Sequence, residues 1–301
     1  MTIFEQADAQ LLPGFTRRPV VVDGNEIMTL QAGNGPALLM LHGDPQTHLC
    51  WHEIAPKLLD RFRVVLADLR GRGESHKPPH NAQNNRYSKR EMAREQVALM
   101  NQLGHERFSV VGHDRGARVA RRLALDHPQT VEQLVLMDVV PALDFYNNTN
   151  ARIAQDYFYF FFLTQDHPLP DSLIKADADA FMRSILLGLS DTPVKYSPIA
   201  LKAYLAASTT DDAVTAMCEC FRAGLHIDQQ HDAIDMQRGN KIDCPTLIMW
   251  GENGIVGKHF NMEKLYTKWC SQPEFVSIQS GHFMPDEAPE ATYKAIANFL
   301  K

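Results

Sequence analysis

The side chain best suited to chemistry in this 301-residue chain is an aspartate between two glycines, in the run Gly112-His113-Asp114-Arg115-Gly116. An apolar stretch (108–111) precedes it and a helix-compatible stretch (117–126) follows. Strand, sharp turn and helix form a nucleophile elbow, in which small flanking residues leave the central side chain exposed above a sheet. A carboxylate there suits displacement at saturated carbon, giving an ester that water then cleaves. We therefore expect Asp114 to be the nucleophile of a hydrolase for carbon-halogen bonds or epoxides.

A carboxylate nucleophile also needs a base that activates water and an acid that orients this base. His282 is the predicted base, because it lies in Ser-Gly-His-Phe after the last predicted strand. Two residues compete as the acid: Asp138, which ends the strand after the elbow helix, and Glu252, which follows a later strand. The position a little beyond Gly251, where an acid is also expected, has Asn253-Gly254 and no aspartate. We predict Asp138, with Glu252 as the alternative.

Two arginines follow the predicted nucleophile. Arg115 is its neighbour, and Arg118 lies three residues further on, on the same face of the helix that begins there. Two guanidinium groups can bind a substrate carboxylate by paired hydrogen bonds and keep Asp114 ionised. A small anionic substrate follows from this interpretation. The alternative is that one of them, Arg118 in particular, forms a salt bridge with Asp44 or Asp138.

The elements that must position these residues alternate between short apolar strands and helices. Continuous apolar runs are typical of strands buried on both faces, so the pattern predicts an α/β fold with a mostly parallel, doubly wound sheet. Arg121 and Arg122, further along the elbow helix, are expected in solvent. The predicted strands are a hairpin (20–22 and 27–31), 37–41, 63–67, 108–111, 131–139, 245–250 and 275–278, and the predicted helices are those around 52–59, 89–103, 117–126 and 290–300.

The pattern changes after Pro141. The next hundred residues contain no repeated strand, and their aromatic-rich helical stretches are interrupted by prolines such as Pro168, Pro170 and Pro198. We interpret this segment as a helical cap inserted after the sixth strand. The expected organisation is a core domain (1–142), the cap (143–240) and the second part of the core domain (241–301).

Composition excludes several classes of function. The net charge of -6 gives no strong field for nucleic acid or an anionic membrane, and no apolar run approaches bilayer length. The five cysteines are scattered, which fits neither a disulfide framework nor a zinc site. The first ten residues do not resemble a signal peptide. We expect a cytoplasmic enzyme that needs no metal or other cofactor.

Several motifs resemble those of the fluoroacetate and haloacetate dehalogenases of the α/β-hydrolase fold. The most specific is Gly-His-Asp-Arg-Gly-Ala-Arg at 112–118. The others are His-Gly-Asp-Pro-Gln-Thr-His at 42–48, Ala-Asp-Leu-Arg-Gly at 67–71, Leu-Ala-Leu-Asp at 123–126, Met-Asp at 137–138, Arg-Ala-Gly at 222–224 and Ser-Gly-His-Phe at 280–283. The resemblance implies hydrolysis of small 2-haloacids such as haloacetate and fluoroacetate, and usually a homodimer. It also implies Asp114 as nucleophile, His282 as base and Asp138 as acid, with Arg115 and Arg118 on the substrate carboxylate and an oxyanion hole near Asp44 and Arg115.

The cap departs from this family. Members that release fluoride have a His-Trp pair and a tyrosine as hydrogen-bond donors to the halide, whereas this chain has Tyr159, Phe160 and Phe221 at the matching places. Fluoride is a poor leaving group, so the loss of donors favours chloro- or bromoacetate. Asp44 replaces the usual phenylalanine. Its carboxylate could raise a neighbouring pKa, pair with Arg115, or repel an anionic substrate.

Two further hypotheses are compatible with the same residues. An epoxide hydrolase would use the same nucleophile, base and acid, and would need cap tyrosines to protonate the opening oxygen. Tyr159 could supply that proton, together with Tyr157 or Tyr204. A relative that kept the fold but only binds a ligand is the other hypothesis, since fold does not fix function.

Overall fold

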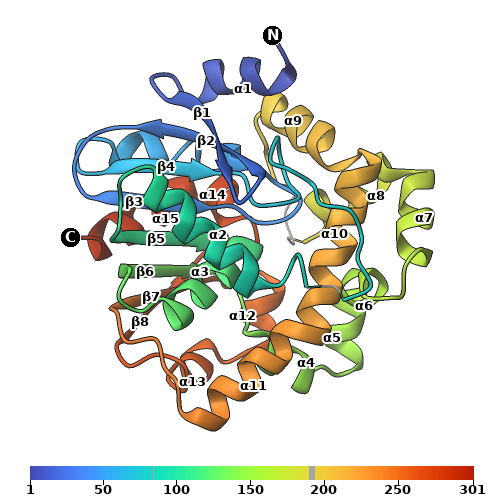
Figure 1. The fold of residues 1–301 in the computed structure, drawn as a ribbon. Coiled ribbons are helices and arrows are strands. Elements are labelled where there is room, and N and C mark those ends of the chain that lie inside the picture. Colours follow the sequence, from blue (N-terminus) through green and yellow to red (C-terminus); the bar gives the residue numbers. More distant parts are fainter. Residues whose placement is uncertain (84, 190–193) are drawn as a thin grey trace.

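A computed structural model describes residues 1–83, 85–189 and 194–301. Its centre is an eight-stranded sheet in the order β1-β2-β4-β3-β5-β6-β7-β8 (Figure 1). β2 is antiparallel to both of its neighbours, and all other pairs are parallel. This confirms the predicted α/β fold. The strands are β1 Thr16–Val22, β2 Asn25–Ala32, β3 Ala37–Leu41, β4 Arg63–Ala67, β5 Phe108–His113, β6 Val131–Met137, β7 Thr246–Gly251 and β8 Pro273–Ile278.

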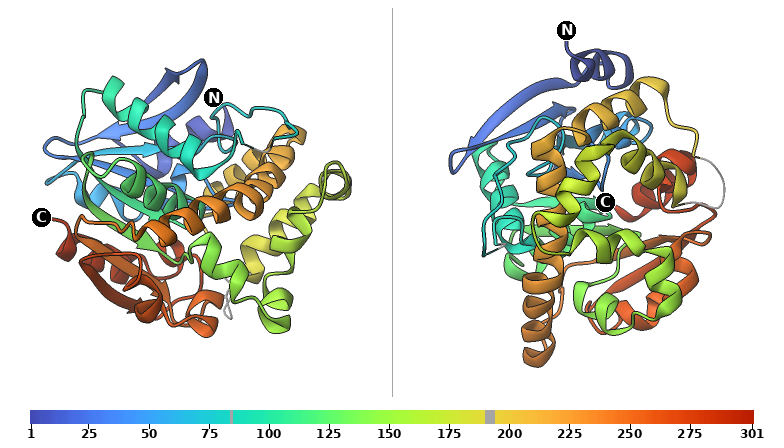
Figure 2. Two further views of the ribbon diagram at one scale, coloured as in Figure 1. Left: turned by 60° about the horizontal axis from the view of Figure 1, so that its bottom comes forward. Right: turned by 90° about the vertical axis from the view of Figure 1, so that its right-hand side faces the viewer.

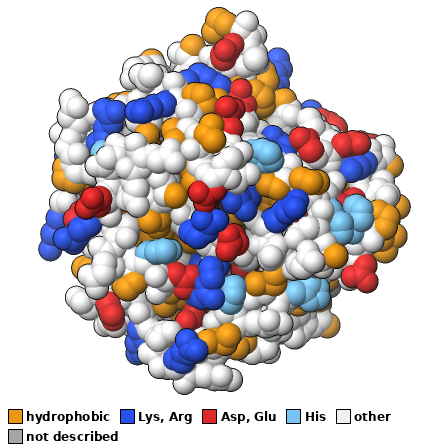
Figure 3. All heavy atoms as spheres, in the orientation of Figure 1, with side chains coloured by type: hydrophobic (Ala, Val, Ile, Leu, Met, Phe, Trp, Pro, Cys, Tyr) orange, Lys and Arg blue, Asp and Glu red, His pale blue; other side chains and the backbone are white. Residues whose placement is uncertain are grey.

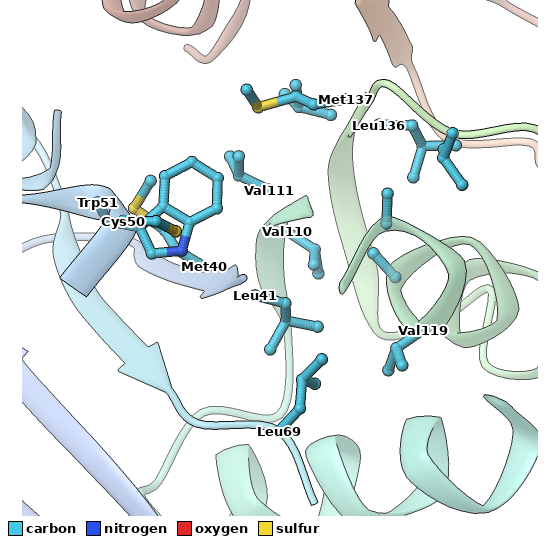
Figure 4. Close-up of a cluster of buried hydrophobic side chains, with 14 of the residues drawn as sticks. Met40, Leu41, Cys50, Trp51, Leu69, Val110, Val111, Val119, Leu136 and Met137 are labelled. Atoms are coloured by element: carbon cyan, nitrogen blue, oxygen red, sulfur yellow. The ribbon is translucent and has the colours of Figure 1, made fainter. Parts of the chain in front are cut away.

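The central strands are buried because helices cover the sheet. Every residue of β3 and β5 is buried, as expected for continuous apolar runs in a parallel sheet. On one side, α2 (Lys89–Gln102) packs on α3 (Arg115–Asp126), and α3 packs on β5 and β6. Figure 4 shows part of this core, including Met40, Leu41, Trp51, Val110, Val111, Val119, Leu136 and Met137.

The strands end where the sequence analysis placed the chemistry. β5 leads directly into Asp114 and α3, and the loop after β8 contains His282. β6 ends at Met137, two residues before the predicted end, because Asp138 has a left-handed backbone with φ of 48°. Parallel strands bring these carboxyl ends to the same edge of the sheet.

The segment between β6 and β7 is helical, and no strand occurs among its described residues. Its helices lie together on one side of the sheet in Figures 1 and 2. Side chains from this segment line pockets together with Asp114, so it covers the carboxyl edge of the sheet. The helices are α4 Ala142–Asn147, α5 Ala151–Asp156, α6 Phe158–Leu163, α7 Leu169–Ala176, α8 Ala178–Gly188, α9 Pro198–Ser208, α10 Asp211–Ala223, the π-helix η3 Gly224–Asp228 and α11 Gln229–Arg238.

The helix predicted around 52–59 is wrong. The chain instead forms two 3-10 helices, η1 (His48–Trp51) and η2 (Ala55–Leu58). Pro56 lies at the start of η2, and it has no N–H with which to continue a helical ladder from the preceding turn. The remaining helices are α12 Ile255–His259, α13 Met262–Tyr266, α14 Met284–Glu287 and α15 Pro289–Phe299.

The helix α1 (Ile3–Leu11) was not predicted. It begins with a capping box between Thr2 and Glu5. Its Asp8 accepts a hydrogen bond of 2.8 Å from Nε2 of His48, whose Nδ1 donates to Asp68 at 2.8 Å. Burial would lower the pKa of His48, but the two carboxylates outweigh burial and raise it to about 10. A charged histidine therefore joins α1 to the core.

The expectation that Arg121 and Arg122 lie in solvent is also wrong. Both are buried against α11. Arg121 donates to Asp232 at 2.7 Å, while Arg122 donates to Asp232 at 2.9 Å and to Asp235 at 2.6 Å. These ion pairs depend on a helix more than a hundred residues away, which a local pattern on α3 cannot indicate.

Among the described residues, no helix is both long and apolar enough to cross a membrane.

Candidate active site

Asp114 occupies a strained turn between β5 and α3. Its φ of 47° and ψ of -112° are rarely adopted by residues with a side chain. The flanking glycines are required by close packing: a Cβ on Gly116 would lie 2.2 Å from the Leu41 carbonyl oxygen. A Cβ on Gly112 would lie 2.7 Å from the backbone of Ala117. The turn therefore has the geometry that the Gly-His-Asp-Arg-Gly run predicts.

The two oxygens of the Asp114 carboxylate have different surroundings. Oδ1 accepts a hydrogen bond of 2.9 Å from the backbone N–H of Asp44. Oδ2 lies 4.0 Å from Nε2 of His282. Burial would raise the pKa of Asp114, but the charges of Arg115 and His282 outweigh burial and lower it to about 2. Asp114 is therefore ionised at neutral pH and has one oxygen held by a backbone donor.

His282 lies between the two aspartates. Its Nδ1 donates a hydrogen bond of 2.6 Å to Oδ2 of Asp138, which directs Nε2 toward Asp114. Oδ1 of Asp138 accepts from the N–H of Gly251 at 3.1 Å, so this aspartate does not cap a helix. Burial would lower the pKa of His282, but the hydrogen bond and charge of Asp138 outweigh burial and raise it. The arrangement can transfer a proton at Nε2.

Glu252, the alternative acid, lies away from this site. Its side chain is exposed and accepts hydrogen bonds from the hydroxyl of Ser277, at 2.6 Å, and from the amide of Gln279. Of the two candidate acids, only Asp138 contacts the histidine.

The loop that carries His282 is held by a glutamate that the sequence patterns did not indicate. The carboxylate of Glu287, in α14, accepts from the backbone N–H of Gly281 at 2.6 Å and from that of Phe283 at 2.8 Å. These two amides lie on either side of His282. A carboxylate that binds both of them fixes the path of the backbone at His282, the predicted base.

Arg115 and Arg118 are both buried, and neither guanidinium forms a hydrogen bond or an ion pair with a described residue. Arg115 stacks on two aromatic rings, with Cζ 3.7 Å from the centre of Phe221 and 4.7 Å from that of Phe160. Burial and the nearby charge of Arg115 lower the pKa of Arg118. Buried guanidinium groups without partners are costly unless an anion binds them. The alternative considered for these arginines, a salt bridge from Arg118 to Asp44 or Asp138, does not form.

Asp44 pairs with an arginine that was not singled out. Its Oδ2 accepts a hydrogen bond of 2.6 Å from Nη2 of Arg72, and Nε of Arg72 donates to Oδ1. Asp44 therefore does not pair with Arg115. This excludes one of the three roles that the sequence analysis considered for its carboxylate. Because its charge is compensated by Arg72, Asp44 presents mainly its backbone N–H to Asp114.

Two pockets adjoin the Asp114 carboxylate. The first pocket includes all three cap residues of the sequence analysis, and the second includes Arg118 and Tyr157. The surface of the first pocket is mostly apolar and that of the second is mostly polar. An apolar pocket beside a few polar groups is typical of a site for a small ligand. The first is lined by Asp44, Pro45, Asp114, Tyr159, Phe160, Ile185, Met217, Phe221 and His282, and the second by Asp114, Arg118, Asp138, Val139, Val140, Phe145, Tyr157, Phe160 and Val256.

The five cysteines are free. Among the described residues no group of three or more His, Cys, Asp or Glu side chains could hold a metal ion.

Comparison with known proteins places this geometry in a family. The alpha/beta hydrolase fold family matches residues 36–289. The chain belongs to this family. A fluoroacetate dehalogenase from Burkholderia sp is 37% identical to this α/β hydrolase over 291 residues, which cover 96% of this chain and 95% of the relative. This similarity confirms the resemblance to dehalogenases that the motifs indicated.

Two other similarities bear on the α/β hydrolase. A soluble epoxide hydrolase from Corynebacterium sp. (strain C12) is 28% identical over 95% of this chain and 97% of its own. The solved structure of a candidate α/β hydrolase from Nostoc sp PCC 7120 superposes with a TM-score of 0.93 at 43% identity, covering 95% of this chain and 98% of that one. The fold is therefore shared along the whole chain, while the named relatives differ in the bond that they cleave.

The sequence of this α/β hydrolase predicted best the candidate site residues that are neighbours in the chain. The elbow brings Asp114, Arg115 and Arg118 together within one turn of helix. Glu287 could have been found only from its spacing of five residues after His282, and Arg72 had no local signal.

Proposed function

We propose that the protein is a hydrolytic dehalogenase of small 2-haloacids, a hydrolase that acts on carbon-halide bonds. The observation that carries this proposal is the pair of buried guanidinium groups of Arg115 and Arg118 beside the ionised carboxylate of Asp114. Neither group has a hydrogen-bond or ion-pair partner among the described residues. Two such groups suit the carboxylate of a haloacid, and Asp114 suits attack on its α-carbon. The 37% identity to a fluoroacetate dehalogenase supports the same substrate class.

In the first half-reaction, Oδ2 of Asp114 attacks the α-carbon, the carbon-halogen bond breaks, and the halide leaves with the bonding electrons. Oδ2 is the attacking atom because Oδ1 is held by the N–H of Asp44. The product is an ester between Asp114 and the acid. Arg115 and Arg118 hold the carboxylate of the substrate so that the carbon lies in line with the oxygen.

In the second half-reaction, water attacks the carbonyl carbon of the ester and Nε2 of His282 takes its proton. The charge that develops on Oδ1 is stabilised by the N–H of Asp44, which acts as an oxyanion hole. Asp138 holds the imidazole and compensates the charge that it gains. The ester bond then breaks, and the leaving oxygen takes the proton from Nε2 of His282 to give the hydroxyacid. The Asp114 carboxyl keeps one oxygen from the water and loses its proton to solvent, which restores the carboxylate.

The leaving halide faces the cap. Tyr159, Phe160 and Phe221 line the pocket that contains Asp114, and only the tyrosine has a hydroxyl donor. Each donor to a developing anion contributes roughly 3 kcal/mol in comparable sites. Chloride and bromide need less of this help than fluoride does. We therefore propose chloro- and bromoacetate as better substrates than fluoroacetate.

The second candidate function is epoxide hydrolysis, which the similarity to a soluble epoxide hydrolase favours. It needs a tyrosine to protonate the epoxide oxygen. Tyr159 and Tyr157 each line a pocket with Asp114, and burial raises the pKa of both, which keeps their protons on. Tyr204 lines neither pocket. Turnover of styrene oxide but not of chloroacetate would favour this function.

The decisive experiment is a halide-release screen over fluoro-, chloro- and bromoacetate with wild type and the His282→Asn variant. We expect the variant to stop after one turnover with Asp114 esterified, which intact-protein mass spectrometry detects. An unmodified mass after halide release would contradict the ester route. Tight binding of a small carboxylate without any turnover would instead favour a ligand-binding relative.

We also propose a homodimer, as the family resemblance implies. The cap exposes Leu169, Leu173 and Leu187, which are a candidate contact face. Sedimentation velocity of wild type and Leu173→Asp tests this proposal, since a dimer through this face would dissociate in the variant.

A further inference from the structure

A narrow crevice lies between the core and the cap, on the side of α3 that faces α11. Its charged lining residues are Lys89, Arg118, Arg121, Arg122, Asp228 and Asp232, and Pro141 and Ala142 complete its wall. In Figure 3, basic and acidic side chains gather in the middle of the face where Figure 1 shows α2, α3 and α11.

The crevice carries more positive than negative charge. Four of its lining side chains are basic and two are acidic. Arg121 pairs with Asp232, and Arg122 pairs with Asp232, Asp235 and Asp126. Asp228 lies 3.4 Å from Nζ of Lys89. Arg118 has no acidic partner among the described residues. The net positive charge therefore centres on Arg118.

Several nitrogen atoms of the crevice residues are buried without a hydrogen-bond partner. Among the described residues these are Nε of Arg118, and Nε and Nη2 of Arg121, whose guanidinium stacks on the ring of Trp269 with Cζ 4.1 Å from its centre. A buried donor without a partner costs free energy, on the order of 1–3 kcal/mol for each group. A small anion bound in the crevice would supply acceptors for such donors and compensate the surplus charge.

Arg118 also belongs to the pocket that contains Asp114 and Asp138. One side chain therefore forms part of the wall of both spaces. An anion bound in the crevice and an anion bound beside Asp114 would therefore contact the same guanidinium group.

We propose that this crevice is a second binding site for small anions, and that anions enter or leave the catalytic pocket through it past Arg118. The inference rests on the proposed function, in which a haloacid anion and water give a hydroxyacid anion, a halide and a proton. Each turnover then admits one anion and releases two. The crevice would take a halide or a small carboxylate, which share a single negative charge and the ability to accept several hydrogen bonds.

Bromide and acetate are suitable probes. Crystals soaked in a series of sodium bromide concentrations should show an anomalous signal in the crevice, and acetate should displace it. Bromide should also inhibit turnover without competing fully with substrate. An anomalous signal confined to the Asp114 pocket would overturn the proposal.

Charge changes on opposite sides of the crevice supply the stronger test. Lys89→Met should weaken bromide binding in the crevice about threefold to tenfold, and Asp228→Asn should strengthen it by a similar factor. Lys202→Met, which removes an exposed charge on α9, should change nothing. Equal bromide occupancy in all of these variants would overturn the proposal.

Either charge variant can lose stability, because Asp228 also accepts the N–H of Lys89 at 2.8 Å. Ala142→Leu therefore provides a second variant that fills the crevice and leaves its charges intact. It should abolish the bromide signal there, and retention of the signal would contradict the assignment. The bromide site does not depend on turnover, so a wild-type protein that releases no halide refutes the proposed function without refuting the crevice as an anion site.

Discussion

Replacing Glu287 by glutamine should slow the second half-reaction more than the first. The wild-type carboxylate accepts the two amides on either side of His282, at 2.6 and 2.8 Å. A glutamine has one carbonyl oxygen, so it can accept only one of them, and its NH₂ group then faces the other N–H. Losing one hydrogen bond to a charged acceptor costs about 1.5–3 kcal/mol. If this free energy is lost from the positioning of His282 in the transition state of ester hydrolysis, that step slows roughly tenfold to a hundredfold.

The pH profile separates positioning from mere loss of structure. The charge of Glu287 is one of the contributions that raise the pKa of His282, after the hydrogen bond and charges of Asp138 and Asp114 overcome burial. The histidine must be neutral to accept a proton from water. Removing the charge of Glu287 should lower the pKa of His282. The acidic limb of the pH profile for ester hydrolysis should therefore move to lower pH in Glu287→Gln. Glu287→Asp keeps the charge and should leave this limb in place.

The assay is a rapid-quench experiment with bromoacetate, in which halide release reports the first step and intact mass reports decay of the ester. Glu290→Gln is the matched control, since Glu290 is exposed and pairs with Lys57 on the surface. Thermal unfolding monitors the fold of each variant. Ester decay in Glu287→Gln within twofold of wild type, with an unchanged acidic limb, would refute the reasoning.

Three further predictions follow from the site and the core. Among haloacetates, kcat/KM should be at least about a hundredfold higher for chloro- and bromoacetate than for fluoroacetate, since two halide donors are missing; equal values in the halide-release assay would contradict this. Arg118→Lys keeps the charge but loses the paired geometry, so we expect KM for chloroacetate to rise about tenfold with a smaller change in kcat, measured by steady-state kinetics. The pKa of His48 is raised from 6.5 to about 10, so its stabilising charge is fully present below pH 6.5 and is lost as pH rises through about 10. His48→Gln should lower the free energy of unfolding by about 3 kcal/mol at pH 7 and flatten the decline in stability toward pH 10, as denaturant titrations will show.

Local sequence was sufficient for the elbow, but not for every local feature, since it missed α1 and its capping box and predicted one helix where two 3-10 helices form. The apolar run, the glycines and Asp114 specify the elbow by backbone crowding alone, and they place Arg115 and Arg118 on the helix that follows. His282 was identifiable because the loop after the last strand reaches the same edge of the sheet.

Features that depend on distant segments were missed or wrong. Arg122 looked solvated because α3 alone does not reveal that α11 covers it, and Asp44 remained undecided because its partner Arg72 lies in another loop. In each case a charged side chain is buried against a partner that tertiary packing supplies, which hydrophobic periodicity does not record.

In the proposed mechanism, the proximity of His282 to Asp114 couples the two half-reactions. The negative charge of Asp114 helps to keep the imidazole protonated. In the proposed mechanism this charge disappears when Oδ2 becomes an ester oxygen, so the imidazole gives up its proton more readily at the moment when a water molecule has to be activated. Hydrolysis restores the carboxylate and returns the imidazole to its earlier affinity for protons. Formation of the covalent bond thus prepares the enzyme for breaking it, without any movement of the backbone.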